Sequence, residues 1–180
     1  MTTILVICTG NICRSPVAAA MLQRRLTDAH VTSAGLSTEG EPAHVHSIES
    51  AADLGLDLSG HRSRRLTADA VNEADLVLGM ERAHVREAVL LAPPVWPRAF
   101  TLKELVRRMQ NVGPRLPGDD LRTWLAEVHA GREKSMLLGA DPADDVEDPI
   151  GRPRSVFDQT TAEMHAFVDA LVKYAWPDAQ

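Results

Sequence analysis

The chain has 180 residues, a length typical of one folded domain, so we expect residues 1–180 to form a single domain. Its apolar fraction of 44% and charged fraction of 24% are those of a soluble globular protein, and no apolar run is long enough to cross a membrane. The net charge of -6 argues against a nucleic-acid partner. With only two cysteines and no basic, cleavable leader, we expect a cytoplasmic protein without a disulfide framework.

Strand-like and helix-like patterns alternate along the chain. Short apolar runs predict four strands, at residues 3–8, 30–34, 74–80 and 95–100, with the last at a sheet edge because it contains Pro97. Apolar residues at helical spacing predict a helix starting at Ser15-Pro16 and others over 48–54, 81–91, 102–109 and 157–171. This alternation is typical of a small doubly wound α/β fold, with a mostly four-stranded parallel sheet covered by helices on both faces.

Residues 110–145 interrupt the alternation. They are rich in turn residues and contain one amphipathic helical stripe, formed by Leu121, Trp124, Leu125 and Val128. Asp119 or Asp120 is the expected N-cap of this helix. A single short helix cannot bury its apolar face alone, so we predict a helical insertion that packs on the domain. Its position also allows a lid or a dimer contact, and we expect a monomer or a weak dimer.

Both cysteines lie in one short loop, CTGNICRSP, which begins at Cys8. Such a pair could form a disulfide, hold a metal ion or belong to an anion-binding loop. The loop joins a strand to a helix, and ligands of open α/β sheets bind at this edge. Gly10 and Asn11 tolerate the backbone of a tight cradle, and the guanidinium of Arg14 can hold two phosphate oxygens. These groups stabilise a thiolate at Cys8, to which Ser15 can donate a hydrogen bond, so the loop is predicted to bind an anion above a nucleophile.

Cysteine, five residues and then Arg-Ser-Pro, directly after an N-terminal strand, resembles the low molecular weight protein tyrosine phosphatase family. Other segments resemble the same family, namely Ser33-Ala34-Gly35, His61-Arg62-Ser63-Arg64, residues 74–80 (ADLVLGM) and Glu147-Asp148-Pro149. The resemblance covers most of the chain apart from residues 110–145.

The resemblance implies a phosphatase in which the Cys8 thiolate attacks phosphorus and Arg14 stabilises the phosphoryl oxygens. Asp148 would protonate the leaving oxygen and then activate water. No metal or cofactor is implied, and the partner would be a phosphorylated protein. The implied phosphate-binding residues are those of the loop, Thr9, Gly10, Asn11, Ile12, Cys13, Arg14 and Ser15. The implied supporting residues are Ser33, which would brace Asn11, and His61. Cys13 is implied to form a reversible disulfide with Cys8 that protects the oxidised nucleophile.

A few positions bear on the substrate that the resemblance implies. Family members specialised for phosphotyrosine usually have aromatic walls where this chain has Ile150, Gly151 and, by an approximate alignment, Glu39. Protein-arginine phosphatases of the family commonly have threonine at the position of Ile12. The isoleucine therefore favours phosphotyrosine, with phosphoarginine as the alternative.

The sequence also allows other functions and other candidate residues, each with weaker support. Thioredoxin-coupled arsenate reductases share this fold but use two further cysteines, and this chain has none after Cys13. An arsenate reductase that uses an external thiol and a non-catalytic phosphopeptide-binding or redox-sensing protein remain alternatives. Asp144 and Asp145 could replace Asp148 as the acid, but only Asp148 precedes a proline. His44 and His46 are expected to face solvent rather than to bind a metal, because no cysteine or carboxylate cluster is near them.

Overall fold

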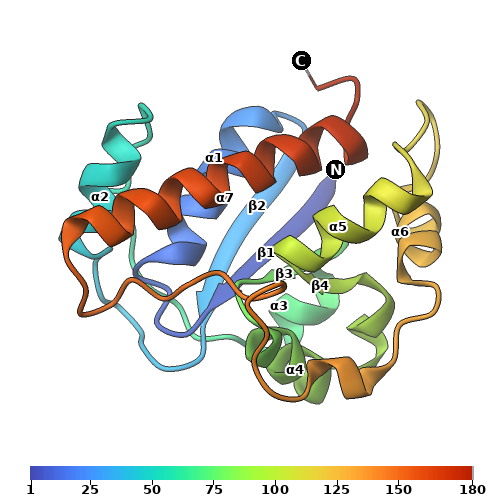
Figure 1. The fold of residues 1–180 in the computed structure, drawn as a ribbon, viewed down its shortest axis with the longest axis horizontal. Helices are drawn as coiled ribbons and strands as arrows, with labels where there is room; N and C mark the ends of the chain where they lie inside the picture. The colour runs from blue at the N-terminus through green and yellow to red at the C-terminus, as the bar shows by residue number, and fades with distance from the viewer. Residues whose placement is uncertain (180) are drawn as a thin grey trace.

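The computed structural model describes residues 1–179 and contains a parallel sheet of four strands. They are β1 (Thr2–Cys8), β2 (Ala29–Gly35), β3 (Leu76–Gly79) and β4 (Ala99–Thr101), in the order β2-β1-β3-β4. All neighbouring strands are parallel, and the register places Cys8 beside Gly35 and Ile7 beside Gly79. The carboxyl ends of the strands therefore lie at one edge of the sheet, with Cys8 at the end of β1 (Figure 1).

Helices connect the strands and cover both faces of the sheet (Figure 1). The α-helices of residues 1–179 are α1 (Arg14–Arg25), α2 (Val45–Ala52), α3 (Ala68–Glu73), α4 (Arg82–Leu91), α5 (Leu102–Val112), α6 (Leu121–His129) and α7 (Arg154–Ala175). Two short 3-10 helices are η1 (Pro93–Arg98) and η2 (Lys134–Leu137). In this part of the chain no helix combines the length and apolarity needed to cross a bilayer. The arrangement confirms the doubly wound α/β fold predicted from the sequence.

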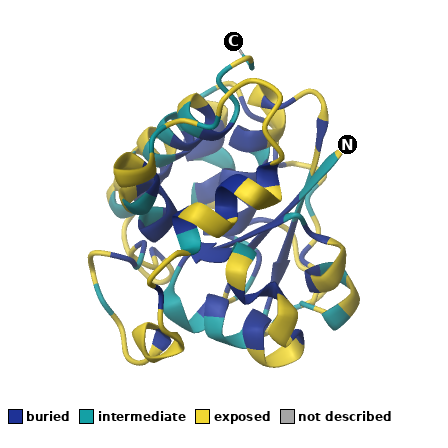
Figure 2. Cartoon of the chain, turned by 90° about the vertical axis from the view of Figure 1, so that its right-hand side faces the viewer, coloured by how far each residue is buried: buried dark blue, intermediate teal, exposed yellow. Residues whose placement is uncertain are grey.

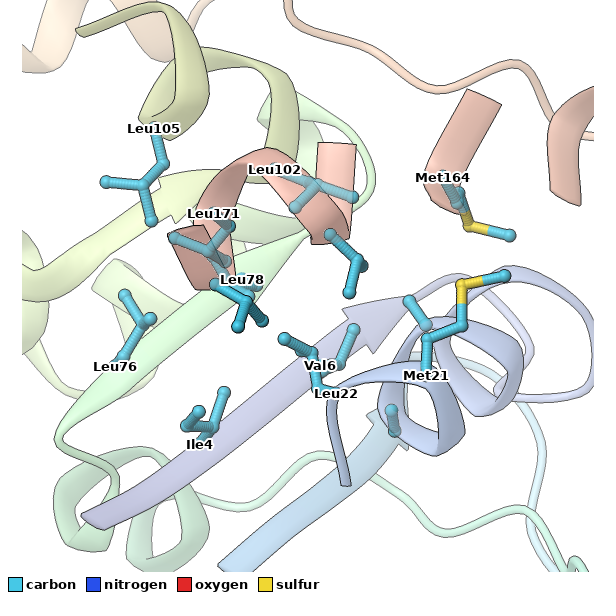
Figure 3. Close-up of a cluster of buried hydrophobic side chains, with 14 of the residues drawn as sticks. Ile4, Val6, Met21, Leu22, Leu76, Leu78, Leu102, Leu105, Met164 and Leu171 are labelled. Atoms are coloured by element: carbon cyan, nitrogen blue, oxygen red, sulfur yellow. The ribbon is translucent and has the colours of Figure 1, made fainter. Parts of the chain in front are cut away.

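Alternate residues of β1 point to opposite faces of the sheet and belong to two separate cores. Ile4 and Val6 pack with buried side chains of α1, α5 and α7 (Figure 3). Leu5 and Ile7 pack on the other face with α3, α4 and η1. Figure 2 shows the result, with buried residues along the sheet and the inner helix faces and exposed residues outside. Because β1 is covered on both faces, its sequence is a continuous apolar run.

Prolines account for the main difference from the predicted strands. Residues 93–98 form η1 rather than the first part of a strand, so β4 has only three residues. Pro93, Pro94 and Pro97 have no N–H to donate to a neighbouring strand, which prevents pairing in this stretch. β4 does lie at the edge of the sheet, which confirms the position predicted from the proline in this run.

Helix boundaries also differ from the predicted ones. α1 begins at Arg14 with Cys13 as its N-cap, so Ser15 is not the cap but a buried residue of the first turn. α3 was not among the predicted helices, and it begins where the Thr67 side chain accepts a hydrogen bond from the N–H of Ala70. The chain leaves α2 through Gly55, whose φ of +72° explains the glycine at that turn.

The segment between α5 and Asp148 contains α6 and η2. Asp120 caps α6, because its carboxylate accepts a hydrogen bond from the N–H of Thr123 at 2.9 Å. The stripe predicted from the sequence is buried in the same core as α5 and α7, and consists of Leu121, Trp124, Leu125 and Val128.

Arg132 links this segment to the sheet. Its guanidinium lies 3.9 Å from the ring centroid of Trp96 in η1 and 4.0 Å from that of Phe100 in β4. Its Nε donates to Glu104 of α5 at 2.7 Å, and both side chains are buried. Arg132 thus contacts three elements of the domain at once.

Candidate active site

The loop after β1 encloses the sulfur of Cys8, and the Cys8 residue is only 2% exposed. The N–H of Asn11 donates to Sγ at 3.2 Å, and the Ser15 hydroxyl lies 3.0 Å from Sγ. Asn11 turns the chain with a φ of +52°, whereas Gly10, the other residue expected to permit this turn, has no positive φ. Because Ser15 belongs to the first turn of α1, the sulfur also lies near the positive end of that helix.

The side chain and carbonyl of Asn11 fix the loop to three other segments. Its Nδ2 donates to Ser15 Oγ at 2.9 Å and to Ser33 Oγ at 2.8 Å, and its Oδ1 accepts from the N–H of Arg64 at 2.9 Å. His61 Nε2 donates to the Asn11 carbonyl at 2.7 Å. Burial lowers the pKa of His61, which favours this neutral donor. Both predicted supporting residues, Ser33 and His61, therefore contact the loop at Asn11.

Gly35 lets the loop approach β2 closely. A Cβ at this position would lie 2.8 Å from the backbone N of Asn11 and 2.9 Å from the carbonyl carbon of Gly10. Any side chain at Gly35 would displace the loop. The Ser33-Ala34-Gly35 segment thus supplies both a hydrogen bond and the space that the loop occupies.

Arg14 is 1% exposed, and two segments, one at Glu81 and one at residues 146–148, hold its guanidinium. Its Nη2 pairs with Asp148 Oδ2 at 2.8 Å, and its Nη1 donates to the Val146 carbonyl at 2.8 Å and pairs with the Glu81 carboxylate. The Nε of Arg14 is buried and has no partner among residues 1–179. A buried donor without a partner is costly. An anion bound by the loop could accept this hydrogen bond.

Asp148 reaches the loop from the far end of the chain. Its backbone is anchored two residues earlier, where the N–H of Val146 donates to the Met80 carbonyl at 2.8 Å. The side chain is 39% exposed and borders a cavity of about 250 Å³. The residues that line this cavity are Cys8, Thr9, Gly10, Ile12, Cys13, Arg14, Ser37, Thr38, Asp148 and Ile150. The structure therefore brings the three predicted catalytic residues together.

The neighbouring aspartates are engaged elsewhere. Asp144 is buried and accepts from Arg82 Nε at 2.7 Å and from Arg107 Nη1 at 2.6 Å. Burial opposes its ionised form, but these hydrogen bonds outweigh burial and lower the pKa of Asp144. Asp145 accepts from the backbone N–H groups of Arg82 and Asp141. Neither aspartate lines the cavity above Cys8.

Cys13 differs from Cys8 in its surroundings. Both thiols are buried and unpaired. Burial raises the pKa of Cys13 to about 12, against a weaker opposing effect of a hydrogen bond with Ser47. Cys13 is therefore a neutral thiol at physiological pH.

A comparison with known families agrees with this geometry. Residues 3–115, which include the loop, Ser33, His61 and Glu81, match the family described as low molecular weight phosphotyrosine protein phosphatase. The chain belongs to this family.

Individual relatives of the phosphatase family extend the match. EpsP of Ralstonia solanacearum, a probable low molecular weight protein-tyrosine-phosphatase, is 44% identical over 104 residues, which are 57% of this chain and 72% of that protein. The protein-arginine-phosphatase of Geobacillus stearothermophilus is 30% identical over 172 residues, which are 94% of this chain and 93% of that protein. The crystal structure of a low molecular weight protein tyrosine phosphatase from T. tengcongensis has a TM-score of 0.72 at 30% identity and covers 96% of this chain and 99% of that chain.

Two residues at the site of this phosphatase-family chain escaped the sequence analysis, Glu81 and His84. Glu81 pairs with Arg14, and His84 Nε2 lies 3.0 Å from the Thr9 hydroxyl. One signal could have found Glu81, because it follows the carboxyl end of β3, beside the end of β1. His84 lies within α4, and the sequence contains no such signal for it.

Two expectations about the surroundings of the site can also be compared with the structure. Ser37 and Thr38 line the cavity, whereas Glu39, expected there by alignment, is exposed and does not. His44 and His46 pack on Phe157, with ring centroids 4.7 and 5.3 Å from the phenyl ring. Both histidines are partly buried against this ring and are therefore only partly exposed to solvent.

Proposed function

We propose that this member of the family hydrolyses phosphotyrosine in proteins through a phosphocysteine intermediate on Cys8. One observation carries the proposal. The buried sulfur of Cys8, the guanidinium of Arg14 and the carboxylate of Asp148 border the same cavity of about 250 Å³. A nucleophile, an anion-binding group and a proton donor are the three components that phosphoryl transfer to cysteine requires.

In the first step the Cys8 thiolate attacks phosphorus in line with the ester oxygen. The S–P bond forms while the P–O bond to the tyrosine breaks, and the Asp148 carboxyl transfers its proton to the leaving oxygen. Arg14 and the backbone N–H groups of the loop stabilise the charge on the three other oxygens. The carboxylate of Asp148 has to leave Arg14 Nη2 when a phosphoryl oxygen takes its place.

In the second step water attacks the phosphorus of the phosphocysteine. Asp148, now ionised, accepts a proton from the water, and the P–S bond breaks to release inorganic phosphate and the Cys8 thiolate. The contacts of Sγ with the N–H of Asn11 and the hydroxyl of Ser15 support the sulfur as a leaving group, because hydrogen bonds to sulfur favour its anionic form. No step requires a metal ion.

The cavity walls support an aromatic substrate. Ile12 and Ile150 line the cavity above the sulfur, and two aliphatic side chains can pack against a flat ring without the aromatic walls expected in phosphotyrosine specialists. A second candidate is phosphoarginine, because the relationship to the Geobacillus protein-arginine-phosphatase extends over 94% of the chain. Thr9, Thr38 and Asp148 supply the polar groups that a guanidinium would need.

The same proposal places the enzyme in the cytoplasm, as a monomer or weak dimer that acts on phosphorylated proteins. The cysteine content supports this location, since two cysteines within one loop are too few for the disulfide framework that is common in secreted proteins.

Hydrolysis of matched peptides tests the proposal. We expect the purified protein to release phosphate from phosphotyrosine peptides faster than from phosphoarginine or phosphoserine peptides of the same sequence. Cys8→Ser should abolish release of phosphate, because an uncharged hydroxyl is a far weaker nucleophile than a thiolate. Faster hydrolysis of phosphoarginine would support the second candidate, and full activity of Cys8→Ser would contradict the mechanism.

A further inference from the structure

His84 connects two residues that both contact Arg14. Its Nδ1 lies 2.9 Å from the backbone N of Glu81, and its Nε2 lies 3.0 Å from the Thr9 hydroxyl oxygen. Thr9 Oγ1 lies 3.5 Å from Arg14 Nη2, and the Glu81 carboxylate pairs with Arg14 Nη1. The four side chains and the Glu81 backbone therefore form a closed ring of contacts around one edge of the guanidinium.

The partners of His84 determine which ring nitrogen carries the proton. The backbone N–H of Glu81 can only donate, so Nδ1 is the acceptor and the neutral ring carries its proton on Nε2. The Nε2–H of His84 therefore donates to Thr9 Oγ1. The ring is 1% exposed, and burial, together with the charge of Arg14, lowers the pKa of His84 to about 4. Near pH 7 the ring is neutral, and both hydrogen bonds persist.

We propose that His84 is a positioning residue, which holds Thr9 and Glu81 against Arg14 and so fixes the guanidinium toward the bound phosphoryl group. The inference rests on the proposed function, because it concerns the anion site of that reaction. A guanidinium binds two phosphate oxygens at once only when its plane is correctly oriented. Contacts that hold Nη1 and Nη2 in place therefore affect phosphate binding by Arg14 more than they would affect binding by a point charge such as an ammonium group. Thr9 also belongs to the loop, and the bond from His84 therefore orients the first residue after Cys8.

Amide side chains can separate the two hydrogen bonds of His84. In His84→Asn the amide oxygen can replace Nδ1 as acceptor for Glu81, but the donor to Thr9 is lost. In His84→Gln the longer side chain can place an N–H close to the position of Nε2, which keeps the donor. Thr9→Val removes the hydroxyl with little change of shape, whereas Thr9→Ser keeps it.

The test measures kcat and KM for p-nitrophenyl phosphate, and separately the affinity for inorganic phosphate by calorimetry. We expect His84→Asn and Thr9→Val each to weaken phosphate binding and kcat/KM by about tenfold, the value of one buried hydrogen bond near a charge. The double variant should lose no more than Thr9→Val alone, because Thr9→Val already removes the bond to His84 along with the contact to Arg14. The losses of phosphate affinity and kcat/KM should be several-fold smaller in His84→Gln than in His84→Asn, and several-fold smaller in Thr9→Ser than in Thr9→Val.

Three results would overturn the inference. Losses that multiply in the double variant would mean that the two residues act independently. Normal phosphate affinity in His84→Asn with a lowered melting temperature would mean that the histidine only stabilises α4. Equal losses in the asparagine and glutamine variants would mean that the donor to Thr9 is irrelevant. A wild-type protein that binds phosphate but hydrolyses no phosphoester would contradict the proposed function alone, because the calorimetric comparison still tests His84.

Discussion

The carboxylate of Asp148 pairs with the guanidinium of Arg14, with Oδ2 and Nη2 2.8 Å apart. The proton donor of the proposed reaction is therefore bound to the group that would bind the substrate. The backbone nearby is fixed separately, because Val146 donates its N–H to Met80 and accepts from Arg14 Nη1 through its carbonyl. Exchange of Asp148 for a phosphoryl oxygen then requires a side-chain rotation but no rearrangement of the segment.

Replacing Asp148 by asparagine should separate its role as proton donor from its competition with phosphate for Arg14. We expect kcat to fall by about 10²- to 10³-fold, because the leaving oxygen loses its proton donor. The loss should be larger with phenyl phosphate than with p-nitrophenyl phosphate, whose leaving group needs the proton less. Phosphate should inhibit the variant at lower concentration, since a neutral amide competes less for Arg14. Steady-state kinetics with both esters measure these effects.

Glu147→Gln is the matched control for Asp148→Asn. Glu147 is the adjacent carboxylate, and it is exposed and pairs with Arg152 at 3.2 Å. Its replacement should leave kcat and inhibition by phosphate nearly unchanged. Equal losses in the two variants would show that the charge of the segment, rather than the carboxyl at position 148, determines activity.

Ser33→Ala should loosen the loop from β2. The variant removes one of the two acceptors of Asn11 Nδ2 and keeps the other, Ser15. We expect the free energy of unfolding to fall by about 1 kcal/mol, typical of one hydrogen bond. We also expect kcat/KM to fall up to about tenfold, because the loop amides lose their fixed geometry. Urea unfolding and kinetics measure both, with Thr32→Ala on the same strand as the control. Unchanged activity at reduced stability would contradict a role of Ser33 in orienting the loop.

The part of the site formed by local segments could be predicted from the sequence. A buried strand followed by Gly10, Asn11 and Arg14 and then by a helix start places an anion-binding loop at the end of β1. Ser33 lies on the next strand, and parallel pairing with β1 brings its end to the same edge of the sheet. These inferences need only the order of the elements and short-range patterns.

The long-range contacts of Arg14 and Thr9 were harder to predict, because the position of Glu81 after β3 is a signal but His84 within α4 has none. Glu81 lies 67 residues from Arg14 and His84 lies 75 residues from Thr9 along the chain. Their contacts depend on how β3 pairs with β1 and on the angle at which α4 leaves β3. The fourth strand was overestimated for a different reason, because the apolar run at residues 95–100 has the β pattern but Pro97 prevents the pairing.

Arg132→Met should destabilise the whole domain. The variant leaves Glu104 buried without a cation, and breaking a buried ion pair in this way costs about 3 to 5 kcal/mol. Arg122→Met is the control, because Arg122 is 55% exposed and its pair with Asp75 contributes about 1 kcal/mol or less. Urea unfolding of both variants measures the difference. A similar small loss in both would show that the pair with Glu104 is solvated in solution.

Ile12→Thr should shift substrate preference toward phosphoarginine. Ile12 lines the cavity above Cys8, and threonine would replace part of an apolar wall by a hydroxyl that can bond to a guanidinium. We expect the ratio of kcat/KM for phosphoarginine to that for phosphotyrosine peptides to rise by roughly tenfold, the scale of one altered pocket contact. Ile12→Val keeps the wall apolar and controls for the change in size. An unchanged ratio would show that position 12 does not select the substrate.

The stability of the protein should decrease as the pH falls from about 6.5 to about 4. The pKa of His84 is about 4 in the folded protein and 6.5 for an ordinary histidine, so between these values the unfolded chain binds a proton that the folded chain does not. Above about pH 6.5 His84 causes no loss of stability. As the pH falls to about 4, the free energy of unfolding decreases by on the order of 3 kcal/mol because of this histidine. Burial lowers the pKa of His44, His61 and His129 as well, which gives a dependence of the same sign.

His84→Asn isolates the contribution of His84 to this pH dependence. Urea unfolding at about pH 5 and about pH 7 should show a smaller difference in the free energy of unfolding for the variant than for the wild type, because asparagine does not titrate. The remaining difference comes from the other buried histidines. His30→Asn, at an exposed position of β2, serves as the control and should keep the wild-type difference. Equal differences in the wild type and in His84→Asn would contradict a neutral, buried His84, and with it the two hydrogen bonds that join Glu81 to Thr9.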